Sequence, residues 1–274
     1  MTIQSKFDLA GRSALVTGAA SGLGLAYAEA MAEGGAGVTL TDIDGDAAEA
    51  EAARLRQQGF DARGARLDVT DREATRAVVD DHVAAFGGLQ IAFANAGVDA
   101  GEGFWNPDGH RNPEGQVDAY DPTRWDLSIG VNLTGVFNTI RDCVRAIKAT
   151  GGPGSVIATS SNAAVVNEPI VGLPYMPAKA GVKHMVEHLA LELAAFGIRV
   201  NAIAPGPFVT NIGGGWLKKD PVVRRKWDSL VPLGRVAETE QIKPLALFLA
   251  SDASDYMTGA HLMIDGGMAL GKFE

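Results

Sequence analysis

Short apolar segments alternate with longer segments of helical periodicity along the chain. The apolar segments predict strands at 13–16, 38–41, 65–68, 91–94, 155–159, 199–203 and 261–264. The longer segments, many rich in alanine, predict helices at 22–33, 46–58, 71–86, 124–150, 175–196 and 238–250. Continuously apolar strands are typical of parallel strands that are covered on both faces. We therefore expect an α/β fold, a single domain over 1–274 with a Rossmann-type doubly wound parallel sheet and helices on both faces.

Two segments interrupt this alternation. Residues 98–123 are rich in Gly, Asp, Pro and Asn, and residues 206–233 read as a second irregular stretch. Each follows a predicted strand, so each should lie at the carboxyl edge of the sheet, where open α/β sheets bind ligands. We expect both to be substrate loops. At the predicted helix starts, Asp46 and Asp71 are the expected N-caps.

Composition removes several classes of protein. The formal net charge is −9, with 24 Lys and Arg against 33 Asp and Glu, which argues against a nucleic-acid or anionic-membrane partner. One cysteine among 274 residues excludes a disulfide framework. The sequence shows neither a secretory signal nor an apolar run of the roughly 18 residues that a membrane helix needs. These features predict a soluble cytoplasmic protein.

Glycines follow the first predicted strand. The run Thr17-Gly18-Ala-Ala-Ser21-Gly22-Leu23-Gly24 leads directly into a helix. Glycines at such a turn let the backbone approach a pyrophosphate, and the helix N-terminus offers it free N–H groups. The strict G-x-G-x-x-G spacing is not met, because Tyr27 occupies the third glycine position counted from Gly22. A simple tight turn is the structural alternative.

Asp42 ends the second predicted strand, about 20 residues after the glycines, where a ribose-binding acid belongs. A carboxylate there accepts hydrogen bonds from both ribose hydroxyls and repels a 2′-phosphate. Ile43 follows it, and no Lys or Arg stands within 17–24. The sequence therefore favours NAD over NADP as cofactor, unless Asp42 merely caps a turn.

Tyr175 and Lys179 lie four residues apart at the start of a long helix, so they share one face. A tyrosine with a pKa near 10 must lose about 3 units to act as a base at neutral pH, which costs about 4 kcal/mol. An ammonium about 4 Å away supplies roughly that amount. On its own, this spacing is common on solvated helix faces.

Several further motifs occur in a fixed order, and together they resemble the short-chain dehydrogenase/reductase family from Leu9 to Gly267. They are Thr17-Gly18-x-x-x-Gly22-x-Gly24, Asp68-Val69, Asn95-Ala96-Gly97, Val-Asn132-Leu-Thr-Gly, Ser160-Ser161, Tyr175-x-x-x-Lys179, Asn201 followed by Pro205-Gly206, and Asp265-Gly266-Gly267.

The resemblance implies a catalytic tetrad of Asn132, Ser161, Tyr175 and Lys179. In the family, the tyrosine exchanges the proton, the serine binds the carbonyl oxygen, the lysine lowers the tyrosine pKa and holds the ribose, and the asparagine anchors a water. The implied cofactor-binding residues are Gly18, Ser21, Gly22, Leu23, Gly24, Asp42, Asp68, Val69, Asn95, Ala96, Gly97, Tyr175, Lys179, Pro205, Gly206, Phe208 and Thr210.

Three features depart from the family pattern. The interval from Ser161 to Tyr175 is one residue longer than expected, so Ser160 or Asn162 is an alternative to Ser161, which we favour. Pro177 stands within the Tyr-x-x-x-Lys motif, where the first turn of a helix tolerates it. The loop at 98–123 is long, which limits what relatives say about the substrate.

Phe104, Trp105, Asn162 and Trp216 are the candidate substrate residues, although each aromatic side chain is equally suited to anchoring its loop. The run from His184 to His188 matches the H-x-x-E-H zinc pattern, but no remote third ligand is evident. We therefore expect no metal.

The leading hypothesis is an NAD-dependent oxidoreductase that interconverts a secondary alcohol, cyclic or aromatic, and its ketone by hydride transfer, with Tyr175 as acid/base. A 3-oxoacyl-thioester reductase of the same fold and a non-catalytic NAD-binding protein are the alternatives. The resemblance also implies a homotetramer packed through the helices at 124–150 and 175–196.

Overall fold

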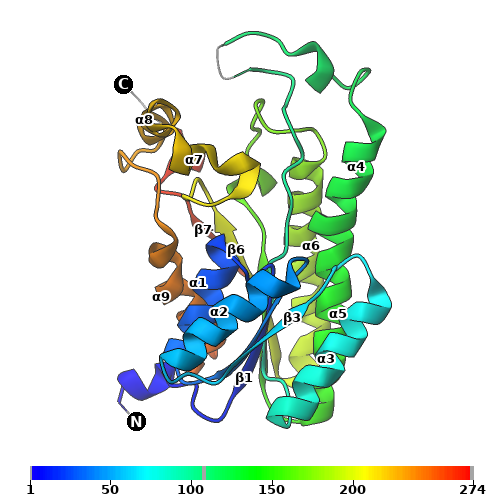
Figure 1. Cartoon of the computed structure of the whole chain (residues 1–274), viewed down its shortest axis with the longest axis vertical. Coiled ribbons are helices and arrows are strands. Elements are labelled where there is room, and N and C mark those ends of the chain that lie inside the picture. The colour runs from blue at the N-terminus through cyan, green and yellow to red at the C-terminus, as the bar shows by residue number, and fades with distance from the viewer. Residues whose placement is uncertain (1, 107–108, 272–274) are drawn as a thin grey trace.

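A seven-stranded parallel sheet forms the centre of the molecule (Figure 1). The computed structural model describes residues 2–106 and 109–271, with only the backbone of residues 213, 214 and 216. The strands lie in the order β3-β2-β1-β4-β5-β6-β7. They are β1 (Ser13–Thr17), β2 (Gly37–Asp42), β3 (Ala62–Arg66), β4 (Ile91–Ala94), β5 (Gly154–Thr159), β6 (Ile198–Pro205) and β7 (His261–Ile264). The strand order reverses between β1 and β4, which is where such sheets bind a dinucleotide.

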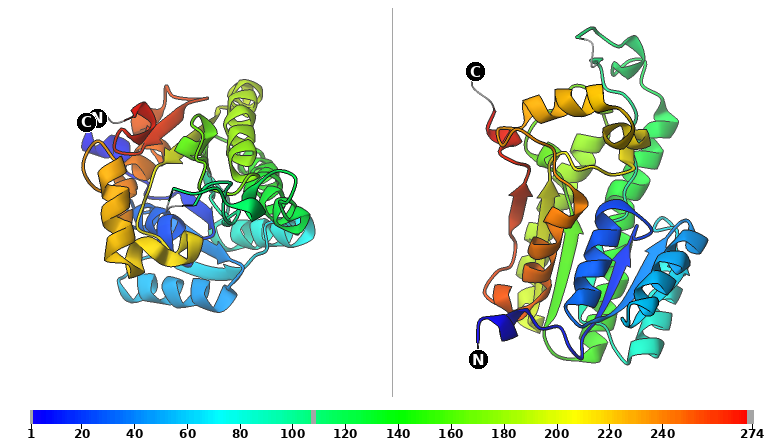
Figure 2. Two further views of the ribbon diagram at one scale, coloured as in Figure 1. Left: turned by 90° about the horizontal axis from the view of Figure 1, so that it is seen from above. Right: turned by 60° about the vertical axis from the view of Figure 1, so that its left-hand side comes forward.

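Helices cover both faces of this sheet (Figure 2). They are α1 (Gly22–Glu33), α2 (Gly45–Gln57), α3 (Arg72–Phe86), α4 (Pro122–Ile129), α5 (Val136–Thr150), α6 (Tyr175–Leu193), α7 (Trp216–Lys219), α8 (Pro221–Leu230) and α9 (Lys243–Ala250). Helices α1 and α9 enclose one core cluster with β1 and β2. Helices α3, α5 and α6 enclose a second cluster on the opposite face. The predicted single-domain doubly wound fold is confirmed.

Strand patterning explains which boundaries were predictable. Strands β1, β4 and β5 are buried at every position, so their apolar runs identified them. The third strand lies at the sheet edge and has the sequence Ala-Arg-Gly-Ala-Arg. The predicted strand at 65–68 was therefore wrong in its bounds, because an edge strand has no need for an apolar run. Asp68 lies beyond the strand.

Two predicted helices are interrupted. The segment 124–150 contains α4, a π-helical turn over Gly130–Gly135, and then α5, rather than one continuous helix. The segment 238–250 opens with a 3-10 turn over Thr239–Ile242 before α9 begins. Periodicity alone does not report a local change in winding. A π-helical turn inserts an extra residue and commonly marks a functional position.

The expectation that 206–233 is irregular was wrong for most of its length. It contains a 3-10 turn over Ile212–Gly215, then α7 and α8, and Asp220 caps α8 through the backbone N–H groups of Val222 and Val223. The glycine run and the polar residues of α8 concealed this helical content. These helices lie above the carboxyl ends of the strands (Figure 2).

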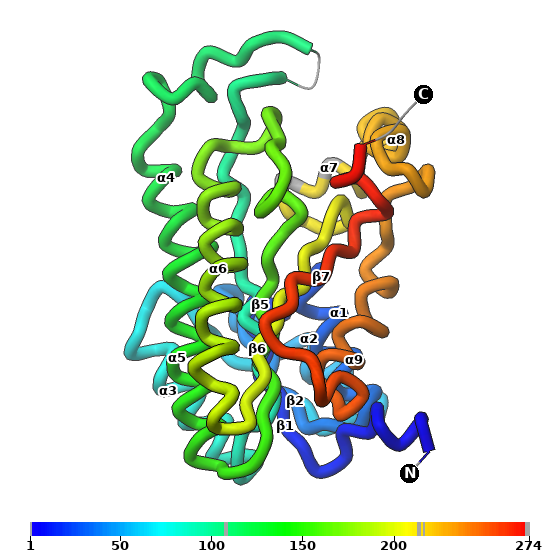
Figure 3. The backbone as a smooth tube through the Cα atoms, turned by 180° about the vertical axis from the view of Figure 1, so that it is seen from behind, coloured from blue at the N-terminus to red at the C-terminus, as the bar shows by residue number. Residues whose placement is uncertain are grey.

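The segment 98–123 leaves the body of the molecule as an arm beyond α4 (Figure 3). Near its outer end, Trp105 and Arg111 form an antiparallel bridge, and the N–H of Asn106 donates to the carbonyl of His110 at 2.7 Å. Below the tip, Gly103 N donates to the carbonyl of Ile170 at 3.0 Å. Main-chain hydrogen bonds thus attach the arm to the loop that precedes α6.

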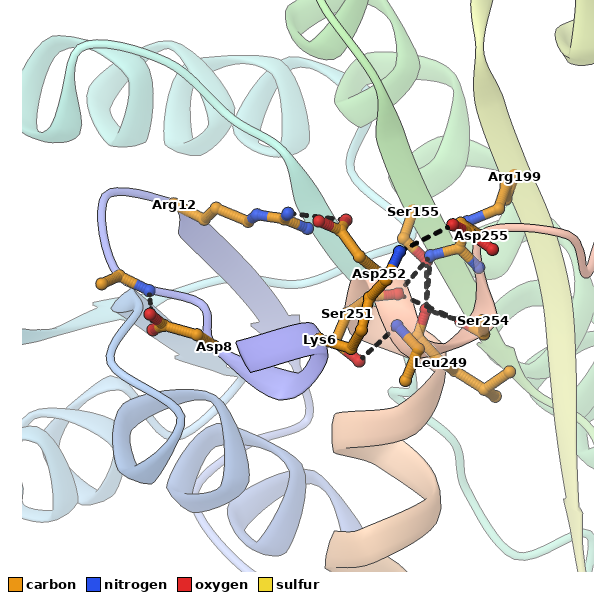
Figure 4. A network of polar contacts seen from close by, with 12 residues as sticks. Lys6, Asp8, Arg12, Ser155, Arg199, Leu249, Ser251, Asp252, Ser254 and Asp255 are labelled. Carbon is orange, nitrogen blue, oxygen red and sulfur yellow. Dashed lines mark hydrogen bonds and ion pairs between the residues drawn. The ribbon is translucent and has the colours of Figure 1, made fainter. Parts of the chain in front are cut away.

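A polar network holds the opposite, amino edge of the sheet together (Figure 4). Arg12 pairs with Asp252 at 2.6 Å, and Lys6 pairs with Asp255 at 3.1 Å. The Arg199 guanidinium, at the start of β6, donates to the carbonyl of Leu249 at 2.9 Å. The network joins the N-terminal segment to the end of α9, and it lies away from the candidate site.

Asp44, and not Asp46 as expected, is the N-cap of α2. Its carboxylate accepts from Ala47 N at 3.0 Å, whereas Asp46 lies inside the first turn. Asp71 caps α3 as predicted. The two aspartates near α2 lie two residues apart, so spacing alone did not show which of them is the N-cap.

Replacement of this cap gives a direct test. Asp44→Ala should lower the free energy of unfolding by about 1 kcal/mol, because it leaves an N–H of the first turn without an acceptor. Urea denaturation measures the change. The matched variant Asp46→Ala should cost less than half as much, and equal costs would contradict the assignment.

Candidate active site

Close packing defines the glycine loop between β1 and α1. A Cβ atom at Gly24 would lie 2.0 Å from the carbonyl oxygen of Gly18 and 2.5 Å from Asn95 Nδ2, so only glycine fits. The N-cap residue Ser21 makes no side-chain cap hydrogen bond and is exposed. The loop therefore presents open backbone N–H groups at a helix N-terminus, which suits an anionic pyrophosphate.

Asn95 joins the ends of three central strands. Its Nδ2 donates to the carbonyls of Thr17 at 2.9 Å and Gly18 at 3.2 Å, and its Oδ1 accepts from Thr159 Oγ1 at 2.9 Å. Thr17 Oγ1 in turn accepts from the backbone N–H groups of Asn95 and Ala96. The predicted cofactor residues Gly18, Asn95 and Ala96 are thus brought together.

Asp42 lies at the carboxyl end of β2, beside the glycine loop. Its Oδ2 accepts from Ala20 N at 3.1 Å and its Oδ1 from Asp44 N at 3.2 Å. These contacts fix the orientation of the carboxylate and leave further lone pairs for hydroxyl groups. Ile43 beside it is largely exposed.

Asp68 and Val69 follow β3 on the same edge of the sheet. The Asp68 carboxylate accepts from the hydroxyl and the backbone N–H of Thr70, and both bonds hold the pKa of Asp68 below its usual value. Val69 is buried, and its carbonyl accepts from Asn138 Nδ2 at 2.9 Å. The two residues lie at the carboxyl edge of the sheet, beside the ends of β2 and β3.

The π-helical turn before α5 directs Asn132 inward. Asn132 is fully buried, accepts from Val98 N at 3.1 Å and donates to the Val98 carbonyl at 3.0 Å. A Cβ atom at Gly97 would lie 2.9 Å from Asn132 Oδ1 and 3.8 Å from Lys179 Nζ. Gly97 therefore occupies the narrow space in front of both side chains.

The structure separates the three serine candidates. Ser160 points away from the tyrosine, because its Oγ donates to the Lys179 carbonyl at 3.1 Å and contacts His261 Nε2 at 3.0 Å. The Ser161 hydroxyl lowers the pKa of Tyr175 and so faces that side chain. Asn162 accepts from Ser161 Oγ at 3.1 Å. Of the two serines, Ser161 is the one directed toward Tyr175.

Tyr175 and Lys179 project from the first turns of α6. Lys179 is buried and its Nζ donates to the Thr159 carbonyl at 2.9 Å, while lying 5.6 Å from the centre of the Tyr175 ring. Burial lowers the pKa of Lys179 to about 8. Burial also raises the pKa of Tyr175 to about 12, against the lowering effect of the nearby Ser161 hydroxyl. Without a cofactor, the tyrosine is thus held as a proton donor.

The segment after β6 closes the site from the other side. A Cβ atom at Gly22 would be 3.5 Å from Thr210, so this segment contacts the glycine loop. Pro205 ends β6, and a Cβ atom at Gly206 would overlap Asp265. Phe208 is buried within the core cluster of α1 and α9.

The predicted substrate residues fall in different environments. Phe104 is 45 % and Trp105 is 37 % exposed on the arm. Asn162 is 3 % exposed and adjoins Ser161. The side chain of Trp216 lies outside the described part of the structure. The arrangement thus places Asn162 beside Ser161 and leaves both arm aromatics partly exposed.

Sequence reasoning missed Glu168. Its carboxylate lies near Tyr175, where it raises the pKa of the tyrosine, and it interacts with the Asn162 side chain. The available signal was a single acid within 163–174, a segment whose only other polar side chain is Asn167, between the serine and the tyrosine.

The His184 and His188 pattern has a structural explanation. His184 is 86 % exposed and pairs with Glu187, which also pairs with Lys183. Within the described residues, no group of three His, Cys, Asp or Glu side chains is placed to hold a metal ion.

None of the helices that the structure describes has both the length and the apolar composition that crossing a membrane requires.

Known proteins resemble this chain over most of its length. A family model described as enoyl-(acyl carrier protein) reductase matches residues 18–269. The cis-4-hydroxycyclohexanecarboxylate dehydrogenase of Sinomonas cyclohexanicum is 37 % identical over 256 residues, which cover 93 % of this chain and 96 % of the relative. A short-chain type dehydrogenase/reductase from Mycobacterium marinum superposes with a TM-score of 0.87 at 33 % identity, covering 97 % of this chain and 99 % of that structure. The chain belongs to the short-chain dehydrogenase/reductase family.

Family membership establishes the general chemistry. A gluconate 5-dehydrogenase from Burkholderia cenocepacia in complex with NADP and tartrate has a TM-score of 0.86 and 32 % identity, covering 98 % of this chain and 99 % of that structure. Members of this family are oxidoreductases that use a nicotinamide cofactor on small-molecule alcohols and ketones. This short-chain dehydrogenase/reductase carries the same fold across its described length.

The buried lysine has a measurable cost. Because the folded pKa of Lys179 is about 8, below its usual 10.5, the folded state binds fewer protons than the unfolded state between these values. Burial therefore destabilises the cofactor-free protein by about 3 kcal/mol at pH 6.5, and this penalty falls by about half at pH 9.5.

Lys179→Met should accordingly stabilise the cofactor-free protein at pH 6.5. We expect a gain of about 2 kcal/mol, after loss of the hydrogen bond to Thr159 costs about 1 kcal/mol, and almost no gain at pH 9.5. Thermal unfolding at both pH values measures it. Lys183→Met on the same helix should give no such gain, and a destabilised Lys179→Met protein at pH 6.5 would contradict the interpretation.

Proposed function

We propose that this enzyme is an NAD-dependent oxidoreductase that interconverts a secondary alcohol, most suitably a cyclic one, and its ketone. The observation that carries the proposal is the convergence of Ser161, Tyr175 and Lys179 in front of the glycine loop, with Tyr175 partly buried and Lys179 fully buried. The dehydrogenase from Sinomonas cyclohexanicum, named for a hydroxycyclohexane substrate, supports the cyclic alcohol.

The residues present fit a nicotinamide dinucleotide. The open helix N-terminus at Gly22–Gly24 suits the pyrophosphate, and Asp42 suits the adenosine ribose. Among the described residues, Lys179 Nζ has only the Thr159 carbonyl as a hydrogen-bond acceptor, so two N–H groups remain for the second ribose. When bound, the cofactor supplies the hydride acceptor.

Proton transfer falls to the tyrosine and its neighbours. In alcohol oxidation the phenolate of Tyr175 accepts the hydroxyl proton, and the Ser161 hydroxyl donates to the substrate oxygen as it becomes a carbonyl. The Lys179 ammonium favours the phenolate and so opposes the burial that raises the tyrosine pKa. Asn132, held by Val98, provides the anchor for a proton-relaying water behind the lysine.

Asp42 supports NAD as the cofactor. Its carboxylate is oriented by two backbone N–H groups. A 2′-phosphate would be repelled by the negative charge of Asp42, and no Lys or Arg within residues 17–24 would offset that repulsion. Because the gluconate 5-dehydrogenase binds NADP, family membership does not decide this preference, and it rests on Asp42 alone.

The alternative of a 3-oxoacyl-thioester reductase has less support. A carrier-bound thioester requires a basic entrance, whereas this chain has a net charge of −9 and places Asp99 and Glu168 near Tyr175. A non-catalytic NAD-binding role is disfavoured because all four tetrad residues are present. We also propose a homotetramer, supported by the apolar groove between α5 and α6 that Phe137, Val144 and Leu189 line.

Removal of the phenolic hydroxyl tests the mechanism. Tyr175→Phe should lower kcat/KM for cyclohexanol oxidation with NAD by roughly 10²- to 10⁴-fold, because no other group at this position accepts the proton. NAD reduction followed at saturating cofactor measures the loss. Tyr256→Phe, at a fully exposed tyrosine, is the matched control. Normal turnover of folded Tyr175→Phe protein would refute the proposal.

Replacement of the ribose-binding acid tests cofactor choice. The double variant Asp42→Ser with Ile43→Arg should lower kcat/KM for NAD by roughly 10-fold or more, since it loses charge-assisted hydrogen bonds, and should raise that for NADP. Asp46→Ser is the control. If the wild-type enzyme already prefers NADP, the assignment of Asp42 is wrong.

A further inference from the structure

The helix α6 begins at Tyr175 without a side chain that could cap it. Its N-cap residue is Pro174, whose ring carries no hydrogen-bond acceptor, and its first helical residue is Tyr175 itself. The N–H groups of a first turn have no acceptor within the helix, so an uncapped first turn unwinds easily. Unwinding there would displace the tyrosine. The position of Tyr175 therefore depends on an acceptor from outside the helix.

The loop before α6 supplies that acceptor from its main chain. The N–H of Tyr175 donates to the carbonyl of Gly172 at 3.1 Å. The N–H of Gly172 in turn donates to the carbonyl of Gly101, in the arm, at 2.9 Å. On the same turn of α6, Met176 Sδ contacts the N–H of Glu168 at 3.5 Å. The start of α6 is thus bonded to the loop, and the loop is bonded to the arm.

Further contacts make the arm and the loop a short antiparallel pair. Glu102 forms an antiparallel bridge with Val171, and the N–H of Trp105 donates to the carbonyl of Pro169 at 3.1 Å. A Cβ atom at Gly103 would lie 2.2 Å from that same carbonyl oxygen, so the two segments are in very close contact. Several main-chain bonds would have to break together before the loop could leave the arm.

Close packing at Gly172 involves both the outgoing and the returning part of the arm. A Cβ atom at Gly172 would lie 2.3 Å from the carbonyl oxygen of Ala100 and 2.6 Å from the hydroxyl oxygen of Tyr120. The Tyr120 hydroxyl donates to that Ala100 carbonyl. Gly172 does not have a positive φ, so packing and not backbone conformation requires glycine here.

The arm is itself anchored to the body of the molecule at both ends. At its start, Val98 exchanges two hydrogen bonds with Asn132, at 3.1 and 3.0 Å. At its end, Asp121 caps α4 by accepting from Thr123 N at 2.8 Å. Helix α4 also carries Ser128, whose hydroxyl accepts from Asn132 Nδ2 at 3.1 Å. The arm therefore offers Gly172 a fixed support.

We propose that the arm acts as the N-terminal cap of α6, and that Gly172 and Tyr120 are positioning residues for Tyr175. The Gly172 carbonyl takes the part that a capping side chain plays in other helices, and the arm holds this carbonyl in place. The inference rests on the proposed role of Tyr175 in proton transfer. It gives the arm a part in the reaction that needs no contact with substrate.

Gly172→Ala should separate the loop from the arm. Its Cβ atom would overlap a carbonyl oxygen, and a displacement of about 1 Å near reacting groups lowers rates by up to about 10²-fold. We expect kcat for cyclohexanol oxidation with NAD to fall roughly 10- to 100-fold, while KM for cyclohexanol and Kd for NADH, measured by fluorescence, stay close to the wild-type values. Tyr120→Phe should lower kcat less, because it loses one hydrogen bond.

Hydrogen exchange provides a measurement that needs no substrate. Amides at the start of α6, in residues 175–178, should exchange faster in both variants than in the wild-type protein, whereas those of α5 should not change. Val117→Ala, at an exposed residue of the arm, is the control and should alter neither exchange nor kcat. A purely structural role of the arm would lower Tm and leave kcat at its wild-type value.

The outcomes separate this proposal from the proposed function. If kcat or the exchange at the start of α6 is unchanged in Gly172→Ala, the arm does not position Tyr175. A loss confined to the affinity for NADH contradicts the proposal as well. Should Gly172→Ala fail to fold, Tyr120→Phe decides by the same two criteria. If the wild-type enzyme oxidises no alcohol, the proposed function fails, and the exchange rates still decide whether the arm caps α6.

Discussion

The hydrogen bonds of one asparagine hold the site together. Asn95 links the carboxyl ends of β1, β4 and β5 through Thr17, Gly18 and Thr159. Because Lys179 donates to the carbonyl of the same Thr159, this lysine and the glycine loop share one support. A half-buried amide that uses both its donor and its acceptor groups is held in one orientation, since any rotation leaves polar atoms unpaired. The position of Lys179 relative to the glycine loop therefore follows from the sheet itself.

Sequence predicted most of this central structure because burial on both faces imposes a simple pattern. The strands β1, β4 and β5 are buried throughout and mostly apolar, and motifs stand at their ends. The edge strand β3 lacked that pattern and was misplaced. A change in helix type, such as the π-helical turn before α5, leaves the apolar periodicity almost unaltered, so the sequence pattern did not reveal it.

The substrate side was harder to predict for a different reason. Its residues come from segments that pack on one another only in the folded chain: the arm, the loop before α6 and the helices α7 and α8. Phe104 and Trp105 suggested a pocket by residue type alone, and both lie partly exposed on the arm. Glu168 belongs to no motif, and its effect on the pKa of Tyr175 arises only in the folded chain.

The two edges of the sheet divide the tasks of the molecule. At the amino edge, ion pairs join Arg12 to Asp252 and Lys6 to Asp255, and Arg199 donates to the Leu249 carbonyl. These contacts stabilise the fold and lie away from the candidate site. Loop-closure entropy grows slowly with loop length, so segments at the other edge tolerate insertion at little thermodynamic cost. Such a division favours evolutionary change. Insertions and substitutions in the arm can alter which substrates bind, while the contacts at the amino edge continue to stabilise the fold.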